Sequence, residues 1–330
     1  MEAGHWKRVR QIATARILSN SNDAEARTWL SKAKVTFGDL EGAVADAERA
    51  VAVDPRNAAY QAELAESCAM MAEKVSSLKA LGYVRCMKHA IEASLASDPK
   101  HIDTMLVEMM FTWKAPSIAG GDKRKALRIA ENIRAISGAW GNLAHARLLR
   151  DTGDDATVEG YLMNAVKADP SFYRSRIALA RFYCCTARVK KHELAEKAAK
   201  EALAMDPGAP AGYEILAHVY ASERRWADLE ALIVKADTAC SDDRIAYYAA
   251  AQSLLEAGQD FPRVEKYLTH YMAQPPEGRE PTEAEARWLL ATMYEKSGRK
   301  NDAVRELMAA VKLEPDFEPA KRDLKRLRHG

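Results

Sequence analysis

The sequence predicts an all-α chain built from stacked helix pairs, and three observations lead to that prediction. Apolar and small residues recur at helical spacing on both sides of a short turn, most clearly in the segment 282–315, TEAEARWLLATMYEKSGRKNDAVRELMAAVKLEP. Units of similar pattern follow one another at intervals near 34 residues. Hydrophobic residues make up 48% of the chain, and many of them are alanines, which suit close packing of helices.

The segment 282–315 carries the pattern that identifies the repeat. A first helix is expected to present Leu290, Ala291 and Tyr294 on one face, Gly298 marks the turn, and a second helix ends before Pro315. On the second helix the face is made by small and apolar residues, namely Ala303, Leu307 and Ala310. This spacing resembles the tetratricopeptide repeat, which implies a right-handed superhelix of about eight helix-turn-helix units. One unit cannot bury its own apolar face, so the neighbouring units must supply the core.

The front of the chain, residues 1–22, resembles the second half of a repeat. Gly4 fits the turn between helices, and Trp6, Val9 and Ala13 recur at helical spacing. Two interpretations remain open: a half-repeat that caps the array, or a longer precursor from which a leader was removed. The first predicts a cytoplasmic protein, and the second predicts a periplasmic or secreted one.

Eight repeats are expected to follow, and residues 316–330 form a charged capping helix behind them. The expected boundaries are 23–57, 58–100, 101–138, 139–172, 173–209, 210–243, 244–281 and 282–315. The second repeat is about ten residues too long, and its extra residues, near 71–83, keep helical spacing and should extend both helices. The loop 274–281, with three prolines and one glycine, is expected to be a mobile excursion.

The third repeat is the least regular one. Its first helix has a strongly apolar stripe, and the loop 115–122 (APSIAGGD) is longer than a standard turn. The glycine pair lacks a phosphate-loop motif, so the prediction is a tight backbone turn in which Asp122 caps the next helix, with a ligand loop as the alternative. The Pro plus Gly-Gly-Asp insert resembles one in some bacterial tetratricopeptide proteins, including the periplasmic T component of certain solute-uptake systems.

Charge and cysteine usage narrow the functional classes. Lysine plus arginine (49) nearly balances aspartate plus glutamate (47), so no global field favours nucleic acid, and no apolar run is long enough for a membrane span. The five cysteines have no metal-ligand spacing, and they are expected to be buried hydrophobes or free thiols.

Catalytic signatures are missing from the sequence. Neither a zinc-protease HExxH motif, nor a serine-hydrolase elbow, nor a nucleotide-binding glycine motif is present, and the repeats leave no segment for a separate catalytic domain. A nucleophile at Cys184 or Cys185 paired with a distant histidine is the enzymatic alternative to buried packing. The sequence therefore predicts a non-enzyme with no cofactor and no metal site.

The family resemblance implies that the first helices line a concave groove that binds extended peptides or helices. Counting along the repeats, the inward-facing candidates are Lys32, Thr36, Arg147, Arg150, Arg174, Arg181, Cys184, Glu214, His218, Tyr248, Gln252, Trp288, Thr292 and Glu295. Arginines in the middle and aromatic residues toward the end suit a peptide with an acidic segment and an apolar anchor.

The predicted function is a scaffold or adaptor for a protein or peptide, with a monomer favoured. The alternative is a solute- or lipid-binding protein in which Met105, Met109, Met110 and Trp113 of the long second and third repeats enclose an apolar pocket.

Overall fold

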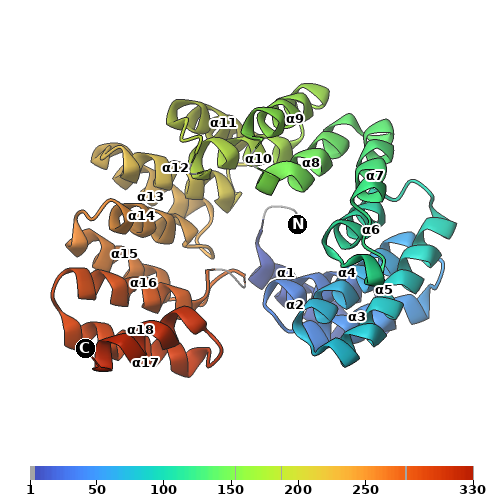
Figure 1. The fold of residues 1–330 in the computed structure, drawn as a ribbon, viewed down its shortest axis with the longest axis horizontal. Helices are drawn as coiled ribbons and strands as arrows, with labels where there is room; N and C mark the ends of the chain where they lie inside the picture. The colour runs from blue at the N-terminus through green and yellow to red at the C-terminus, as the bar shows by residue number, and fades with distance from the viewer. Residues whose placement is uncertain (1–3, 153, 187, 279–280, 330) are drawn as a thin grey trace. The chain divides into compact units, whose positions relative to one another are not determined.

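The structure is a computed structural model, and it describes residues 4–152, 154–186, 188–278 and 281–329. Its described residues form eighteen α-helices and two 3₁₀ helices, with no strand among them (Figure 1). In the first half of the chain the helices are α1 Trp6–Ser19, α2 Ala24–Thr36, α3 Leu40–Val53, α4 Ala58–Lys74, α5 Ser77–Ser97, α6 Ile102–Lys114, η1 Ser117–Ala119, α7 Lys123–Ile136, α8 Gly138–Leu149, η2 Arg150–Thr152 and α9 Asp155–Ala168. In the second half they are α10 Tyr173–Cys185, α11 His192–Met205, α12 Pro210–Ser222, α13 Trp226–Ala239, α14 Ile245–Glu256, α15 Phe261–Met272, α16 Glu283–Lys296, α17 Lys300–Leu313 and α18 Glu318–His329.

These helices follow the order that the repeats predict. Between the single helices α1 and α18 lie eight successive pairs, from α2 and α3 to α16 and α17. Paired helices pack against each other, as α4 does on α5 and α16 on α17. The predicted all-α repeat architecture is confirmed. Among the helices that the structure describes, none is both long enough and apolar enough to be a membrane span.

Turns and helix ends follow from a few residue types. Gly38, Gly258 and Gly298 close the first helices of their pairs with φ of 80°, 64° and 78°, a left-handed conformation that glycine adopts without a Cβ clash. Five of the eight second helices that the structure describes end where a residue precedes proline, and Asp54 (φ −139°, ψ 91°) is one example. Proline disfavours the helical conformation of the preceding residue, so the helix stops there.

The chain divides into two compact units. The first unit is Trp6–Ala178, and the second begins at Leu179, inside α10, and includes His5. Each unit is described by itself below.

The first unit has an alanine-lined core, as expected for closely packed helices. Ala33, Ala43, Ala47 and Ala50 of the first repeat are all fully buried. The long second repeat is confirmed, because α4 has 17 residues and α5 has 21. This added length gives the pair α4 and α5 an extended packing surface, with Met71 and Met87 in its core.

The loop after α6 is a tight turn, as the sequence predicts. A Cβ atom added at Gly121 would lie 1.8 Å from the carbonyl oxygen of Ala115, so only glycine fits there. The Asp122 carboxylate accepts a hydrogen bond from the Lys125 backbone N–H at 3.0 Å, which caps α7.

In the second unit, a glutamate on a second helix repeatedly bonds to the following repeat. Glu196 of α11 accepts hydrogen bonds from the Tyr220 hydroxyl (3.0 Å) and the Arg225 guanidinium (2.6 Å). Glu265 of α15 accepts equivalent bonds from Tyr294 and Arg299 at 2.7 and 2.8 Å. The Arg225 hydrogen bond is the main cause that lowers the pKa of Glu196 to about 2. These contacts tie successive repeats of this unit together.

The described part of the loop 274–281 is anchored at its far end, because the Tyr271 hydroxyl donates a 2.6 Å hydrogen bond to the carbonyl oxygen of Pro281. Residues 279–280 of the predicted excursion lie outside the described residues.

Candidate functional site

The first unit contains a pocket of about 700 Å³. Its walls come mainly from the first helices of successive repeats, α2, α4, α6 and α8, with further residues from α1, α5 and the start of α10. The repeat geometry explains this location, because each first helix presents one side to its partner helix and another to the open face. The pocket is therefore the candidate binding site of this unit.

One wall of the pocket is apolar. It is formed by Met70 of α4 together with Leu106, Val107, Met110 and Phe111 of α6. We call these five residues the apolar strip. They give an incoming apolar side chain a surface on which to bury itself.

The apolar residues of α6 point in two directions, some into the helix-pair core and others into the pocket. Met105 and Met109 are 7% and 0% exposed, and they pack into the core against α7. Trp113 packs against the same core and stacks under the Lys123 ammonium group, 5.1 Å from the ring centroid. The prediction that these three residues enclose a pocket is wrong, and of the four residues named only Met110 lines it. The physical reason is the helix period, which sends neighbouring apolar positions toward α7 and toward α4.

Four cations among the described residues line the pocket, from four different helices: Lys32 of α2, Lys114 of α6, Arg147 of α8 and Arg174 of α10. Lys114 already pairs with Glu73 at 3.0 Å. Arg174 lies over the Trp140 ring, 5.3 Å from its centroid, a cation–π contact that orients the guanidinium. Burial lowers the pKa of Arg147, and the neighbouring Arg150 lowers it further. An arginine in this position gains from pairing with an anionic ligand, which would stabilise its charge.

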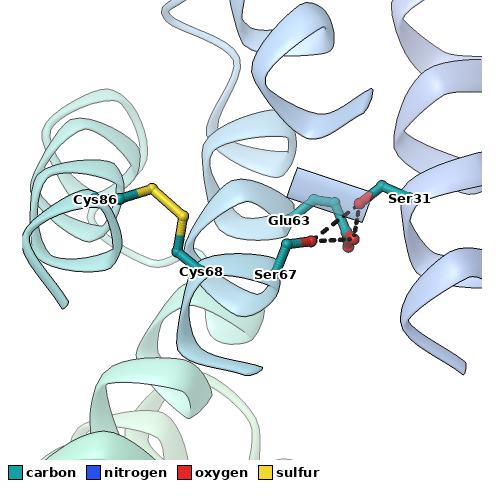
Figure 2. Close-up of a disulfide and its surroundings, with 5 residues drawn as sticks. All are labelled: Ser31, Glu63, Ser67, Cys68 and Cys86. Carbon is teal, nitrogen blue, oxygen red and sulfur yellow. Dashed lines mark hydrogen bonds between the residues drawn. A yellow bond between two sulfur atoms is a disulfide. The ribbon is translucent and has the colours of Figure 1, made fainter. Parts of the chain in front are cut away.

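The pocket lining includes a buried carboxyl group, Glu63 of α4. Figure 2 shows its hydrogen bonds to Ser31 and Ser67. Glu63 is 2% exposed, and its Oε1 accepts hydrogen bonds from the hydroxyls of Ser31 (2.6 Å) and Ser67 (3.2 Å). Its Oε2 has no hydrogen-bond partner among the described residues. Burial, and then the neighbouring charge of Glu66, raise the pKa of Glu63 to about 8.

Glu66 lies one turn further along α4 and is accessible to solvent inside the pocket. The surrounding protein atoms partly displace water from the Glu66 carboxylate, which raises its pKa. The positive charges of Lys32, Arg147 and Arg174 act in the opposite direction and lower it. Water in the open pocket moderates both effects. With Glu73 and Asp103, the described pocket lining holds four acidic groups and four cations beside the apolar strip.

A disulfide holds the hairpin that carries these acids. Cys68 of α4 and Cys86 of α5 are bonded, and Figure 2 shows them close to Ser67 and Glu63. The expectation that all five cysteines are buried hydrophobes or free thiols is wrong for this pair. No pattern along the chain indicates this bond, because the two cysteines meet only when α4 and α5 fold back on each other. Cys184, Cys185 and Cys240 are free.

The structure brings four of the predicted inward-facing residues into this pocket: Lys32, Thr36, Arg147 and Arg174. Arg150 lies outside it, exposed at the start of η2 and 3.9 Å from Asp151. The role of these residues in binding stays a prediction.

The remaining predicted residues belong to the second unit, where each has a partner within the chain. Arg181 pairs with Glu214 at 2.6 Å, and Tyr248 packs against the Tyr271 ring at 5.3 Å. The other six form hydrogen bonds, which are Cys184 with Cys185 (2.7 Å), His218 with Ser253 (2.7 Å), Gln252 with Glu256 (3.1 Å), Trp288 with Asp323 (2.8 Å), Thr292 with the Trp288 carbonyl oxygen (2.9 Å) and Glu295 with Arg326 (2.7 Å).

Sequence reasoning missed Glu63, Glu66 and Met70, although two of them could have been found. Ala24 and Ala58 begin the first helices of successive repeats, 34 residues apart (58 − 24), and the same offset carries Lys32 to Glu66 and Thr36 to Met70. Glu63 is different, because an acidic residue in a helix is usually solvated and only the packing of α2 against α4 buries it.

Comparison with known proteins agrees with this architecture. Residues 284–317 match the family model described as Tetratricopeptide repeat. No curated protein matches the sequence.

Three solved structures share the fold. A tetratricopeptide repeat protein from Parabacteroides merdae ATCC 43184 has 13% identity and a TM-score of 0.51, over 80% of this chain and 98% of that one. Yeast Tom70 has 14% identity and a TM-score of 0.58, over 99% of this chain and 78% of Tom70. The APC/C hetero-tetramer Cut9–Hcn1 has 11% identity and a TM-score of 0.50, over 97% of this chain and 58% of the matched chain.

At these identities the likeness concerns the fold. The fold and its pocket define a helical-repeat solenoid. Residues 284–317 form a tetratricopeptide repeat, and the chain as a whole shares the fold of solved tetratricopeptide-repeat structures.

Proposed function

We propose that this chain is a non-catalytic adaptor that binds a peptide segment of a partner protein in the pocket of its first unit. The observation that carries the proposal is the composition of that pocket, which sets Lys32, Arg147 and Arg174 beside an apolar strip. An acidic side chain of the peptide would pair with the guanidinium groups, and an adjacent apolar side chain would cover the strip. The fold supports this role, since one structural neighbour belongs to a hetero-tetramer.

A rigid repeat array suits such binding. The pocket walls are helices whose opposite sides are held in alanine-lined cores, and the Cys68–Cys86 bond fixes the hairpin of α4 and α5. A surface that is already ordered loses little conformational entropy when the peptide binds, so more of the contact energy appears as affinity.

A peptide selection followed by affinity measurements tests the proposal. A phage-displayed random peptide library is selected on the full chain, and the enriched peptides are expected to share an acidic residue close to a large apolar one. Binding of an enriched peptide is then measured by fluorescence anisotropy to the wild type and to two double variants. Arg147→Glu/Arg174→Glu changes the pocket, and Arg128→Glu/Arg181→Glu makes the same charge change outside it.

The pocket variant is expected to bind at least about tenfold more weakly, because a hydrogen bond to a charged group contributes about 1.5–3 kcal/mol. The control variant should stay within about twofold of the wild type, and thermal unfolding should show that both variants fold. Equal losses in the two variants, or a library that yields no enriched peptide, would contradict the proposal.

The same pocket supports a second candidate, the binding of a charged small solute. Its volume of about 700 Å³ falls within the range of small-molecule sites. The charged walls argue against a lipid, because an alkyl chain would leave Glu66 and Arg147 without solvation or a partner. Native mass spectrometry of the purified protein tests this candidate: a co-purifying small mass supports it, and the mass of the polypeptide alone speaks against it.

We also infer that the protein works in an oxidising compartment. The Cys68–Cys86 disulfide supports this, since such bonds persist mainly outside the reducing cytosol. Alkylation of free thiols in the source cells, read by mass spectrometry, tests the inference, and it is overturned if Cys68 and Cys86 are alkylated there.

A further inference from the structure

Two adjacent thiols and an imidazole meet in the second unit, away from the pocket. Cys184 and Cys185 are the last residues of α10, and His218 lies on α12. One potential ligand atom from each of the three side chains lies within 4.8 Å of the other two. The sequence predicts no metal site because this cluster has no ligand spacing along the chain, and only the packing of these segments brings the residues together.

The two sulfur atoms are positioned for joint use. The Cys185 thiol donates to the Cys184 sulfur, and the two Sγ atoms are 2.7 Å apart. Cys184 is 1% exposed, whereas Cys185 is accessible from solvent. A ligand can therefore enter from the Cys185 side and reach both sulfurs.

The hydrogen bonds of His218 prepare its other ring nitrogen for a ligand. His218 Nδ1 is 2.7 Å from the Ser253 hydroxyl, and that hydroxyl donates to the carbonyl oxygen of Ala249 at 2.9 Å. Because a hydroxyl has one hydrogen, the Ser253 oxygen accepts the proton of Nδ1–H, which leaves Nε2 with a free lone pair. An outer hydrogen bond of this kind commonly fixes the tautomer of a metal-binding histidine.

We propose that Cys184, Cys185 and His218 bind a thiophilic divalent metal ion of the zinc class. Two sulfur ligands and one nitrogen ligand suit zinc, and three protein ligands leave the fourth tetrahedral position for water. Binding converts the two thiols into thiolates and releases two protons, with no oxidation or reduction. The resulting zinc–dithiolate unit is neutral overall, which suits a cluster in which one sulfur is buried.

His192 lies beside the cluster and has an acidic partner of its own. The His192 ring packs edge-on to His218 with 6.5 Å between centroids, and its Nδ1 is 3.4 Å from Glu223. The only other free thiol among the described residues, Cys240, is not in the cluster, since its sulfur donates to the Ala236 carbonyl oxygen at 3.2 Å. Cys240 is therefore a matched control for the loss of a thiol.

Cobalt(II) titration of the full chain tests the proposal. The protein is treated with a chelator and titrated without added reductant, so that the Cys68–Cys86 bond remains formed. The expected result is a thiolate-to-cobalt charge-transfer absorption that saturates at one equivalent and disappears when zinc is added. Because the cluster belongs to the second unit, this result is independent of peptide binding in the first unit.

Variants assign the signal to residues. Cys185→Ser and His218→Gln should each weaken metal binding at least about tenfold, while Cys240→Ser should retain wild-type affinity. Cys185 is exposed at a helix end, so its substitution should leave thermal unfolding of the metal-free protein unchanged, and this is measured for each variant.

The proposal is overturned if the wild type shows no charge-transfer band, or if Cys240→Ser loses as much affinity as Cys185→Ser. If mass spectrometry after alkylation shows that Cys184 and Cys185 are joined in a disulfide, the pair is reduced and titrated again. Failure to bind cobalt at that point also overturns the proposal.

Discussion

The buried carboxyl of Glu63 should make the stability of the protein depend on pH in an unusual direction. In the folded chain its pKa is about 8, raised from 4.5 mainly by burial. At a pH between 4.5 and about 8, Glu63 keeps its proton in the folded state, whereas it has lost that proton in the unfolded chain. The folded state therefore binds more protons, and the contribution of this group to the free energy of unfolding falls as pH rises through that window. Most carboxylates act in the opposite sense, because pairing lowers their pKa.

The expected magnitude follows from the size of the shift. One pKa unit corresponds to about 1.36 kcal/mol, so a rise from 4.5 to about 8 gives on the order of 4 kcal/mol between about pH 5 and pH 8.5. Glu63→Gln keeps an oxygen that can accept the Ser31 and Ser67 hydrogen bonds, but it cannot ionise. The variant should match the wild type near pH 5 and be more stable than it near pH 8.5.

Urea unfolding followed by circular dichroism, at a series of pH values, measures this difference. Subtracting the variant from the wild type removes the contribution of titrating groups that do not interact with Glu63, whereas that of the neighbouring Glu66 remains in the difference. Glu73→Gln, which removes an exposed carboxylate from the same helix, controls for the loss of one negative charge. A difference between wild type and Glu63→Gln that stays constant with pH, or that changes equally in Glu73→Gln, would refute the reasoning.

Two further predictions concern the framework of the pocket. Cys68→Ala/Cys86→Ala should lower the free energy of unfolding by about 3 kcal/mol, because the bond closes a loop with a sequence separation of 18 in the unfolded chain; an unchanged urea midpoint under non-reducing conditions would contradict this. Gly121→Ala should destabilise the protein by about 2 kcal/mol or more, since the new methyl group would meet the Ala115 carbonyl oxygen. Gly160→Ala is its control in open space on α9 and should stabilise the protein by about 0.5–1 kcal/mol, so similar unfolding midpoints for the two variants would argue against the predicted clash.

The candidate site shows which side-chain positions the repeat pattern could predict and which it could not. Counting along the repeats placed Lys32, Arg147 and Arg174 on the inward side, and the structure gathers them at one pocket. The same counting also selected Arg150 and Arg181, which lie elsewhere. Repeat position alone cannot separate the two groups, because the ending of a helix and the local ion pairs decide where a long side chain goes.

By itself, the sequence determined the helix pairs, their order and the main turns. Gly298 at the turn inside the last helix pair, the Asp54–Pro55 stop and the Asp122 cap act through local backbone preferences, which neighbouring residues fix without help from the rest of the chain. The 34-residue interval is likewise visible in the order of residues.

Only the tertiary structure decided which side chains meet. The Cys68–Cys86 bond, the burial of Glu63 between two serines, and the cluster of Cys184, Cys185 and His218 all join residues on different helices. Burial and pKa depend on the atoms that surround a group in space, and those atoms come from segments that are distant in sequence. The repeat pattern therefore specifies the scaffold, and helix packing specifies the chemistry on it.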